Sequence, residues 1–559
     1  MSDSVDVRPG SSQDASGGLS HRQIITILIG LMMAMFLAAL DQTIVATAMR
    51  TIADDLSGFS LQAWATTAFL ITSTISTPLY GKLSDMYGRK PFILFAITVF
   101  IVGSALCGLA QSMYELAAFR AIQGIGAGGL FSLALAIIGD IVPPRERAKY
   151  QGYFLAVFGT SSVLGPLLGG FFAGTQTILG VSGWRWIFYI NIPIAAAAMI
   201  VVTRVLHLPH NRRDHRIDWP GALALIVALV PLLVVAEQGR EWGWGSTRSL
   251  LCFAIGAMGI ALFVFTEWRY KDEALLPLRL FRGRTFAVGS GSSFILGMAM
   301  FGGLLVLPLY LQIVKGASPT RAGLLTLPLV LGIMAGSIIA GQTIARTGRY
   351  RIFPIVGSAL MLAALLLFSR IDADTPLRQI LLIMALMGLG LGGNMQPIVT
   401  AVQNAASPRE IGVSTSTVTF FRSMGGTLGA AVFLSILFSI LPDKIRGAFT
   451  AAAATSEFQQ AAAANPSQVQ ALRQASAGGS AVSLNDTSFI NKLDAALAHP
   501  FKVGFAESMS VVFLIASVIM VIGLIVILFL PELPLRQHSA VQQRAEEDAA
   551  EAAAAQARS

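Results

Sequence analysis

The sequence predicts an all-α polytopic membrane protein with about fourteen membrane-spanning helices. Its 559 residues are 54% hydrophobic and only 12% charged, whereas an ordinary soluble domain has about 25% charged residues. Apolar runs of roughly 20 residues, the length that crosses a bilayer core as a helix, recur along the whole chain. A soluble protein of this length would need a charged surface that this composition does not supply.

The apolar runs divide the chain into six, two and six predicted spans. By length they lie near 24–49, 62–80, 92–111, 115–139, 150–172, 186–206, 219–237, 249–267, 286–312, 320–342, 352–369, 377–400, 411–440 and 503–531. The expected domains are a cytoplasmic tail 1–21, a six-helix bundle 22–217, a two-helix insert 218–270, a second six-helix bundle 271–535 with an outer loop 442–502, and a tail 536–559.

The distribution of basic residues predicts the orientation. An even number of spans places both termini on one side of the membrane. With that side inside, the inner segments hold roughly 24 Lys and Arg and the outer ones about 13, as the positive-inside rule requires. We therefore expect both termini to be cytoplasmic.

An internal repeat with a spacing of about 260 residues relates the two six-helix bundles, a symmetry found in many transporters. The repeated positions include Gly81, Gly88 and Arg89, which recur as Gly341, Gly348 and Arg349. The repeat predicts a cavity between the two bundles.

Charged residues inside predicted spans are the first candidates for function, because an unpaired charge in a bilayer is costly. Asp41 lies well within the first span, Arg120 lies about five residues into the fourth, and Arg422 lies deep in the thirteenth. For Asp41 the alternative is a hydrogen bond to a neighbouring helix, and for Arg120 it is snorkelling to the outer interface. Arg422 either binds an anionic group or restrains a carboxylate.

The inner turn Gly81-Lys82-Leu83-Ser84-Asp85-Met86-Tyr87-Gly88-Arg89-Lys90-Pro91 places Asp85 one helical turn from Arg89. This turn resembles the loop signature of the major facilitator superfamily. Further motifs, over about 24 to 531, resemble its fourteen-span drug:proton antiporter family: Leu40-Asp41-Gln42-Thr43, Arg120-Ala121-Ile122-Gln123-Gly124, Gly165-Pro166-Leu167-Leu168-Gly169-Gly170 and Trp184-Arg185-Trp186 leading into Asn191-Ile192-Pro193.

The resemblance implies the major facilitator fold and a role for each motif. Asp41 and Arg120 would serve proton coupling. The cytoplasmic gate would consist of Gly81, Asp85, Gly88, Arg89 and Asp140, and the antiporter motif of Gly159, Gly165, Pro166, Gly169 and Gly170. The antiporter motif either sets the direction of transport or serves helix packing alone.

Polar and aromatic residues in the spans are candidates for a hydrophobic substrate cavity. They are Gln42, Trp64, Gln123, Tyr310, Asn394, Gln396 and Arg422. The expected partners are a small hydrophobic substrate, protons and membrane lipids, for a monomer in a bacterial plasma membrane. The outer loop 442–502 is either a solvated linker or a docking surface for an envelope partner.

These observations favour a proton-coupled antiporter that exports hydrophobic drugs, cationic ones among them, by alternating access. No Gly-x-x-x-x-Gly-Lys-[Ser/Thr] phosphate loop occurs in the sequence, so ATP-driven transport by this chain is not expected. The resemblance implies that no cofactor is needed and that the proton gradient is the energy source. The six His and two Cys form no metal-ligand pattern, and the basic residues do not gather as in a nucleic-acid surface. A membrane enzyme and a channel are less consistent with these motifs. An exporter of lipids or of an endogenous metabolite is the main alternative.

Overall fold

The computed structural model describes residues 21–56, 62–206, 218–470, 490, 493–537 and 542–543. The expected terminal tails lie mostly outside these residues, as does part of the outer loop 442–502. Within the described ranges, eleven helices are long and apolar enough to cross a membrane. Of the expected spans, 62–80 and 150–172 form long helices that are not among the eleven, and 352–369 forms a shorter apolar helix.

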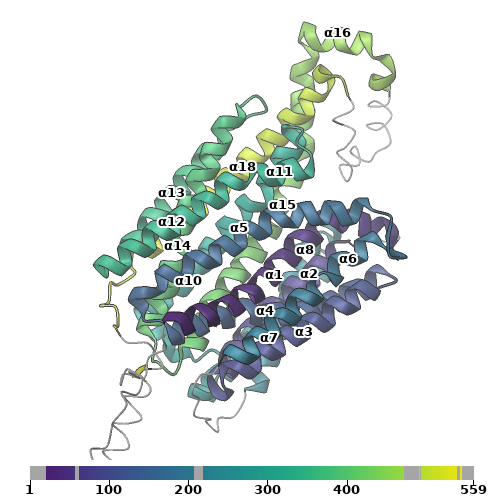
Figure 1. Ribbon diagram of the computed structural model, residues 1–559. Coiled ribbons are helices and arrows are strands. Elements are labelled where there is room, and N and C mark those ends of the chain that lie inside the picture. Colours follow the sequence, from purple (N-terminus) through teal and green to yellow (C-terminus); the bar gives the residue numbers. More distant parts are fainter. Residues whose placement is uncertain are drawn as a thin grey trace, which may run out of the picture.

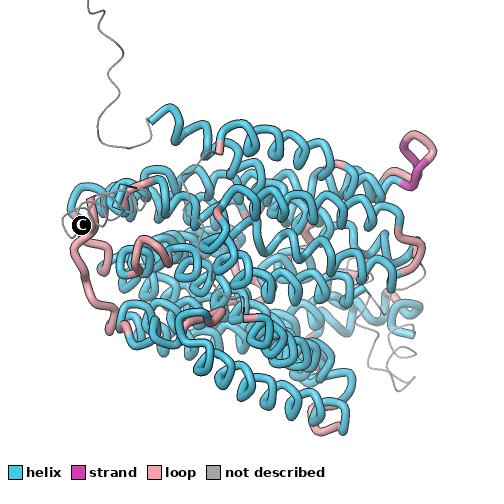
Figure 2. The backbone as a smooth tube through the Cα atoms, turned by 90° about the horizontal axis from the view of Figure 1, so that it is seen from below, coloured by secondary structure: helices cyan, strands magenta, loops and turns pink. Residues whose placement is uncertain are grey.

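The first group of helices packs around two apolar cores within residues 24–206. It consists of α1 (His21–Asp55), α2 (Gln62–Tyr87), α3 (Arg89–Leu109), α4 (Met113–Ile141), α5 (Pro144–Gly174), the short α6 (Trp186–Tyr189) and α7 (Asn191–Val205). A small antiparallel hairpin, β1 (Thr177–Ile178) with β2 (Val181–Ser182), projects from one end of this group (Figure 2).

Local sequence explains where these helices begin. The Ser112 hydroxyl accepts a hydrogen bond from the Glu115 N–H, and the Glu115 carboxylate accepts one from the Gln111 N–H, so α4 begins with a reciprocal cap. Gly88 separates α2 from α3 with a φ of 99°, a left-handed conformation that other residues rarely adopt. Gly348 also has a positive φ, 72°, at the corresponding position of the second half, but its ψ is −2° against 155° at Gly88, so the repeat keeps the glycine and not the geometry of the turn.

The second group of helices packs around one extended apolar core. It consists of α10 (Arg284–Leu309), which ends in a π-helical turn η5 (Tyr310–Val314), then α11 (Pro319–Leu325), α12 (Leu327–Thr347), α13 (Ile352–Phe368), α14 (Leu377–Ala405), α15 (Ile411–Ala453), α16 (Ser456–Ala464) and α18 (Ala495–Leu528). In Figure 1 the two groups lie side by side, and α15 and α18 extend past the other helices towards α16.

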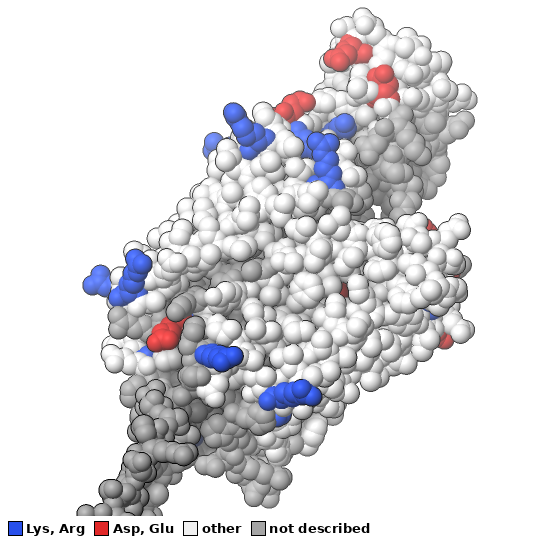
Figure 3. Space-filling model, viewed as in Figure 1, with Lys and Arg blue, Asp and Glu red and all other residues white. Residues whose placement is uncertain are grey.

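The insert between the groups forms α8 (Trp219–Trp242) and α9 (Thr247–Tyr270). Leu225 and Leu229 of α8 share an apolar cluster with Ile71 and Ile75 of α2 and with Phe420 of α15. The insert therefore packs across the seam between the two groups. On the face drawn in Figure 3, Lys and Arg lie towards the ends of the helices and leave a broad uncharged band between them, as expected for a surface in contact with lipid.

Candidate functional site

A carboxylate and a guanidinium form an ion pair in the interior of the first helix group. Asp41 of α1 has 0% of its surface exposed and Arg120 of α4 has 2%. The Arg120 Nη1 group donates to Asp41 Oδ2 at 2.6 Å. The other carboxylate oxygen, Oδ1, accepts from Gln123 Nε2 at 2.9 Å and from Asn191 Nδ2 at 2.8 Å.

Further polar groups surround this pair. The Ser104 hydroxyl of α3 accepts from Gln123 Nε2 at 2.6 Å and from Asn191 Nδ2 at 3.1 Å. Gln123 Oε1 accepts from Arg120 Nη1 at 2.6 Å. On its other side Arg120 lies over the Phe69 ring of α2, with Cζ 4.0 Å from the ring centroid. Within this cluster two buried atoms, Arg120 Nε and Asn191 Oδ1, have no hydrogen-bond partner among the described residues.

These contacts compensate for the burial of the Asp41 charge. A buried carboxylate is tolerated when opposite charge and hydrogen-bond donors compensate for lost water, and Asp41 has both. Protonation of Asp41 would cancel one charge of the pair and leave the Arg120 guanidinium, which stays protonated, without its counter-ion. The snorkelling alternative does not describe Arg120, because its guanidinium is buried and donates to Asp41 and Gln123. Asp41 is hydrogen-bonded to neighbouring helices through Gln123 and Asn191.

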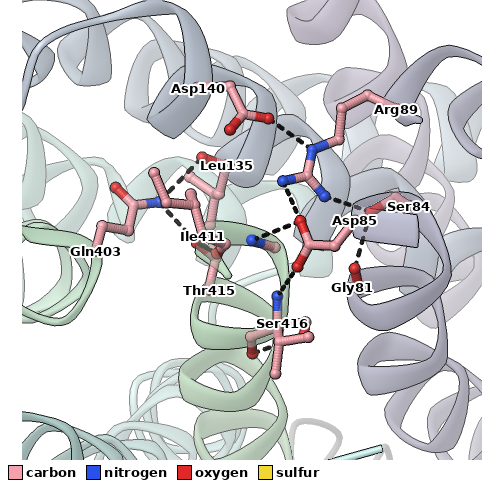
Figure 4. Close-up of polar contacts among 12 residues, drawn as sticks. Gly81, Ser84, Asp85, Arg89, Leu135, Asp140, Gln403, Ile411, Thr415 and Ser416 are labelled. Carbon is pink, nitrogen blue, oxygen red and sulfur yellow. Dashed lines mark hydrogen bonds and ion pairs between the residues drawn. The ribbon is translucent and has the colours of Figure 1, made fainter. Parts of the chain in front are cut away.

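A second charge cluster lies where the two helix groups meet. Arg89 at the start of α3 donates through Nε to Asp140 at 2.7 Å and pairs through Nη2 with Asp85 at 2.5 Å. Its Nη1 also donates to the Ser84 hydroxyl at 2.5 Å. Figure 4 shows Arg89 between the two acids, which come from α2 and α4. The structure thus brings together the acids and the arginine of the expected gate.

Asp85 also connects the two helix groups. Its carboxylate accepts from the Gly412 N–H at 3.1 Å and from the Val413 N–H at 2.7 Å, both in the first turn of α15 (Figure 4). The first N–H groups of a helix have no partner within the helix and carry partial positive charge, so an anion is well placed there. Gly81 permits the close approach, because a Cβ at this position would lie 1.9 Å from the Ser416 hydroxyl.

Sequence reasoning did not anticipate a second bridge between the groups. Arg147 of α5 is buried and donates through Nη1 to Gln403 Oε1 of α14 at 2.7 Å. The Gln403 amide in turn donates to the Leu135 carbonyl at 3.2 Å and to the Thr415 hydroxyl at 2.8 Å. Arg147 and Gln403 are 256 residues apart in sequence, and no local pattern links them. The repeat of Pro144-Arg145-Glu146 at 408–410 places both residues near this end, which is the only available signal.

The residues of the antiporter motif face different neighbours. A Cβ added at Gly165 would lie 2.1 Å from the Thr43 hydroxyl oxygen, and one at Gly169 would lie 2.8 Å from the Ile44 carbonyl oxygen, so both glycines face α1. Gly159 instead faces Val330 of α12, across the seam between the groups. Pro166 contacts the position of Gly323 on α11, and Gly170 has open space beside it. The motif therefore serves two packing surfaces.

The cavity candidates differ in burial. Tyr310 is buried and donates to the Asp372 carbonyl oxygen at 2.6 Å, and Asn394 is buried between α13 and α14, where it accepts from Ser358 at 3.0 Å. Gln123 belongs to the Asp41 cluster. The half-buried candidates are Gln42, Trp64, Gln396 and Arg422. Arg422 has no carboxylate partner among the described residues, and Gln396 Oε1 has no hydrogen-bond partner there.

Two groups of apolar helices, with an ion pair buried inside one group and charges bridging the seam between them, define an integral membrane protein of the transporter class. Comparison with known proteins identifies the family. Residues 31–430 match the family model described as Major Facilitator Superfamily. The chain therefore belongs to the major facilitator superfamily, whose members are multi-pass membrane transporters of small molecules rather than enzymes.

Several relatives carry names that refer to drugs. The chain is 35% identical to Multidrug resistance protein 3 of Bacillus subtilis, over 90% of this chain and 94% of the relative. It is also 35% identical to the Multidrug transporter protein MdtP of B. subtilis, over 94% and 97%. An uncharacterized MFS-type transporter of Mycobacterium tuberculosis is 38% identical over 91% of this chain and 70% of that protein.

Solved structures show the same fold at low sequence identity. The proton:xylose symporter XylE matches with a TM-score of 0.56 at 14% identity, covering 94% of this chain and 99% of that chain. The human organic anion transporter MFSD10 matches with a TM-score of 0.55 at 15% identity, over 89% and 99%.

Proposed function

We propose that this protein is a proton-coupled antiporter that exports hydrophobic drugs, cationic ones among them, from a bacterial cytoplasm. The observation that carries the proposal is the buried ion pair of Asp41 with Arg120. An intramembrane acid paired with a permanent cation can take up and release a proton while its side chain stays inside the helix group. The names of the two B. subtilis relatives favour a drug as the cargo over a lipid or an endogenous metabolite.

The proposed topology has fourteen spans arranged as six, two and six. It adds α2, α5 and α13 to the eleven helices that meet the length and hydropathy requirements. The excess of Lys and Arg supports cytoplasmic termini. The end where α2, α4 and α15 meet would then be cytoplasmic, and the contacts of Asp85 and Arg147 across the seam would close it.

The proposed cycle couples protonation to the opening of this gate. A proton arriving from outside neutralises Asp41, which weakens its attraction for Arg120. Drug then leaves outward, and the two bundles rock so that the contacts of Asp85 with α15 break on the cytoplasmic side. Proton release to the cytoplasm restores the ion pair.

Everted membrane vesicles with a pH-sensitive dye test the coupling. Candidate drugs should collapse an imposed pH gradient with the unaltered protein and not with Asp41→Asn. Asp54→Asn provides a matched control, because Asp54 lies on the same helix and is exposed, and it should behave like the unaltered protein. Full drug-driven proton movement by Asp41→Asn would refute the assignment of Asp41. Resistance profiles across many compounds, set against lipid-export assays, separate the drug cargo from the lipid cargo.

A further inference from the structure

The side chains around Asp41 are arranged for one of its two protonation states. Three side chains contact its carboxylate, and each of them donates: Arg120 to Oδ2, and Gln123 and Asn191 to Oδ1. A carboxylate only accepts hydrogen bonds, whereas a carboxylic acid also has an O–H to donate. The arrangement therefore satisfies ionised Asp41 and offers no acceptor to protonated Asp41.

One of the three neighbours must turn an acceptor towards Asp41 when the proton binds, because an unsatisfied buried O–H is costly. Arg120 has no acceptor atom. The acceptor of Gln123, Oε1, is already occupied by Arg120 Nη1 at 2.6 Å and lies 3.8 Å from the Cys107 sulfur. Asn191 is different, because its Oδ1 is buried and has no hydrogen-bond partner among the described residues.

We propose that the Asn191 side-chain amide rotates by half a turn when Asp41 takes up its proton, so that Asn191 Oδ1 replaces Nδ2 beside the carboxyl group. The proton binds to Asp41 Oδ1, and the new O–H donates to Asn191 Oδ1. No covalent bond of Asn191 changes. On proton release the amide rotates back, and Nδ2 again donates to the carboxylate.

Ser104 fits both orientations of the amide. In the observed state Asn191 Nδ2 donates to the Ser104 hydroxyl oxygen at 3.1 Å and to Asp41 at 2.8 Å. After rotation Asn191 Oδ1 occupies the same place. It then accepts from the Asp41 O–H and from the Ser104 O–H, because a hydroxyl group can either accept or donate. One rotation therefore exchanges donor for acceptor at both contacts of Asn191.

Asn191 is thus a positioning residue for proton exchange, and this inference rests on the proposed role of Asp41. The charged or titratable groups among the described residues of this cluster are Arg120 from α4 and the Cys107 thiol from α3. The contacts from α2 and α7 are the Phe69 ring and the Asn191 amide. The protonation state of Asp41 is the variable to which the amide responds.

Infrared difference spectroscopy of the full-length protein between alkaline and acidic pH tests the rotation directly. For this experiment the protein is produced with asparagine that is labelled with ¹³C at the side-chain carbonyl. We expect an isotope-sensitive amide band to shift together with the conversion of Asp41 from carboxylate to acid, and the shift to disappear in Asn191→Leu and in Asp41→Asn. A conversion of Asp41 without any asparagine band, or a band that persists in Asn191→Leu, would overturn the proposal.

Transport measurements with two variants make the same distinction. Asn191→Thr retains a group that can donate or accept, whereas Asn191→Leu has neither. We expect drug-driven proton release to fall about tenfold in the Leu variant relative to the Thr variant, equivalent to about 1.4 kcal/mol. Equal rates in the two variants would count against the rotation. If Asp41→Asn itself retains full proton coupling, the proposed function fails instead.

Discussion

Replacing Asp85 by Asn should release the contact between the two helix groups. In the structure the Asp85 carboxylate accepts from two backbone N–H groups at the start of α15 and pairs with Arg89. An asparagine keeps one acceptor oxygen and loses the charge. Arg89 retains Asp140 as a partner at 2.7 Å, so the first helix group keeps its own cluster.

The magnitude follows from the bonds that change. A hydrogen bond to a charged group contributes about 1.5–3 kcal/mol, against about 0.5–1.5 kcal/mol for a neutral one. Exchanging two charged bonds for one neutral bond, and losing the attraction of the α15 N-terminus for an anion, should cost the closed gate about 2–6 kcal/mol. At 1.4 kcal/mol per factor of ten, the ratio of closed to open molecules should fall by at least roughly 30-fold.

Distances between spin labels on the two groups measure this ratio. Phe95 on α3 and Ile352 on α13 are exposed and suitable for labelling, in a Cys252→Ser background, since Cys107 is fully buried. We expect a single short distance in the unaltered protein and a second, longer distance in Asp85→Asn. Asp54→Asn, an exposed position on α1, should leave the distribution unchanged. Identical distributions for Asp85→Asn and the unaltered protein would show that the bonds to α15 do not hold the gate closed.

Two further changes test packing and pH dependence. Gly165→Ala should lower the stability of the detergent-solubilised protein by about 1–3 kcal/mol through overpacking against Thr43. Gly170→Ala is the control, because Gly170 lies beside open space, and it should have no effect on the melting temperature. Equal melting temperatures for the two variants would contradict the close α1–α5 packing. The Thr375 hydroxyl donates to Asp372 and lowers the pKa of that carboxyl group in the loop before α14. A carboxyl group whose pKa is lower in the folded state than in the unfolded state stabilises the protein at pH values above its unfolded-state pKa. This stabilisation is lost as the pH falls through the folded-state pKa. The melting temperature should therefore decline in the acid range, and this decline should be smaller in Thr375→Val.

The sequence predicted those features that depend on one segment at a time. Helix positions follow from hydropathy, because lipid acts on each span separately. The pairing of Asp85 with Arg89 follows from their spacing of one helical turn. The cost of a buried charge singled out Asp41 and Arg120, although their contact across 79 residues was not predicted.

Features that depend on several helices could not be predicted in the same way. Asn191 and Ser104 reach Asp41 because α1, α3 and α7 meet there. A polar residue within an apolar run was the available signal for Asn191, and it was noted only as part of a motif. Polarity alone makes Tyr310 and Asn394 cavity candidates, and it does not reveal which side of a helix faces a neighbour; in the structure both are buried and hydrogen-bonded.

The two halves of the repeat share a glycine at the inner turn but differ in charge. Gly348, like Gly88 of the first half, has a positive φ. At the spacing of 260 residues that relates Gly88 to Gly348, Ala345 stands where the first half has Asp85, and at the spacing of 264 residues that relates Pro144 to Pro408, Asn404 stands where it has Asp140. Asn404 donates to the Pro534 carbonyl at 3.0 Å and accepts from the Arg536 N–H at 3.0 Å, so it holds the segment that follows α18.

The starts of the two corresponding helices are alike at their first bonds and differ in the acid that reaches them. Before α5 the Glu146 N–H donates to the Pro143 carbonyl, and before α15 the equivalent Glu410 N–H donates to the Ser407 carbonyl. The following N–H groups of α15, those of Gly412 and Val413, donate to Asp85 on the opposite bundle. Because Ala345 stands at the position of Asp85 in the second half, the second bundle has no carboxylate at the equivalent position to offer to α5. The bonds of Asp85 to α15 therefore join the bundles from one side only, and the contact of Arg147 with Gln403 completes the connection from the other.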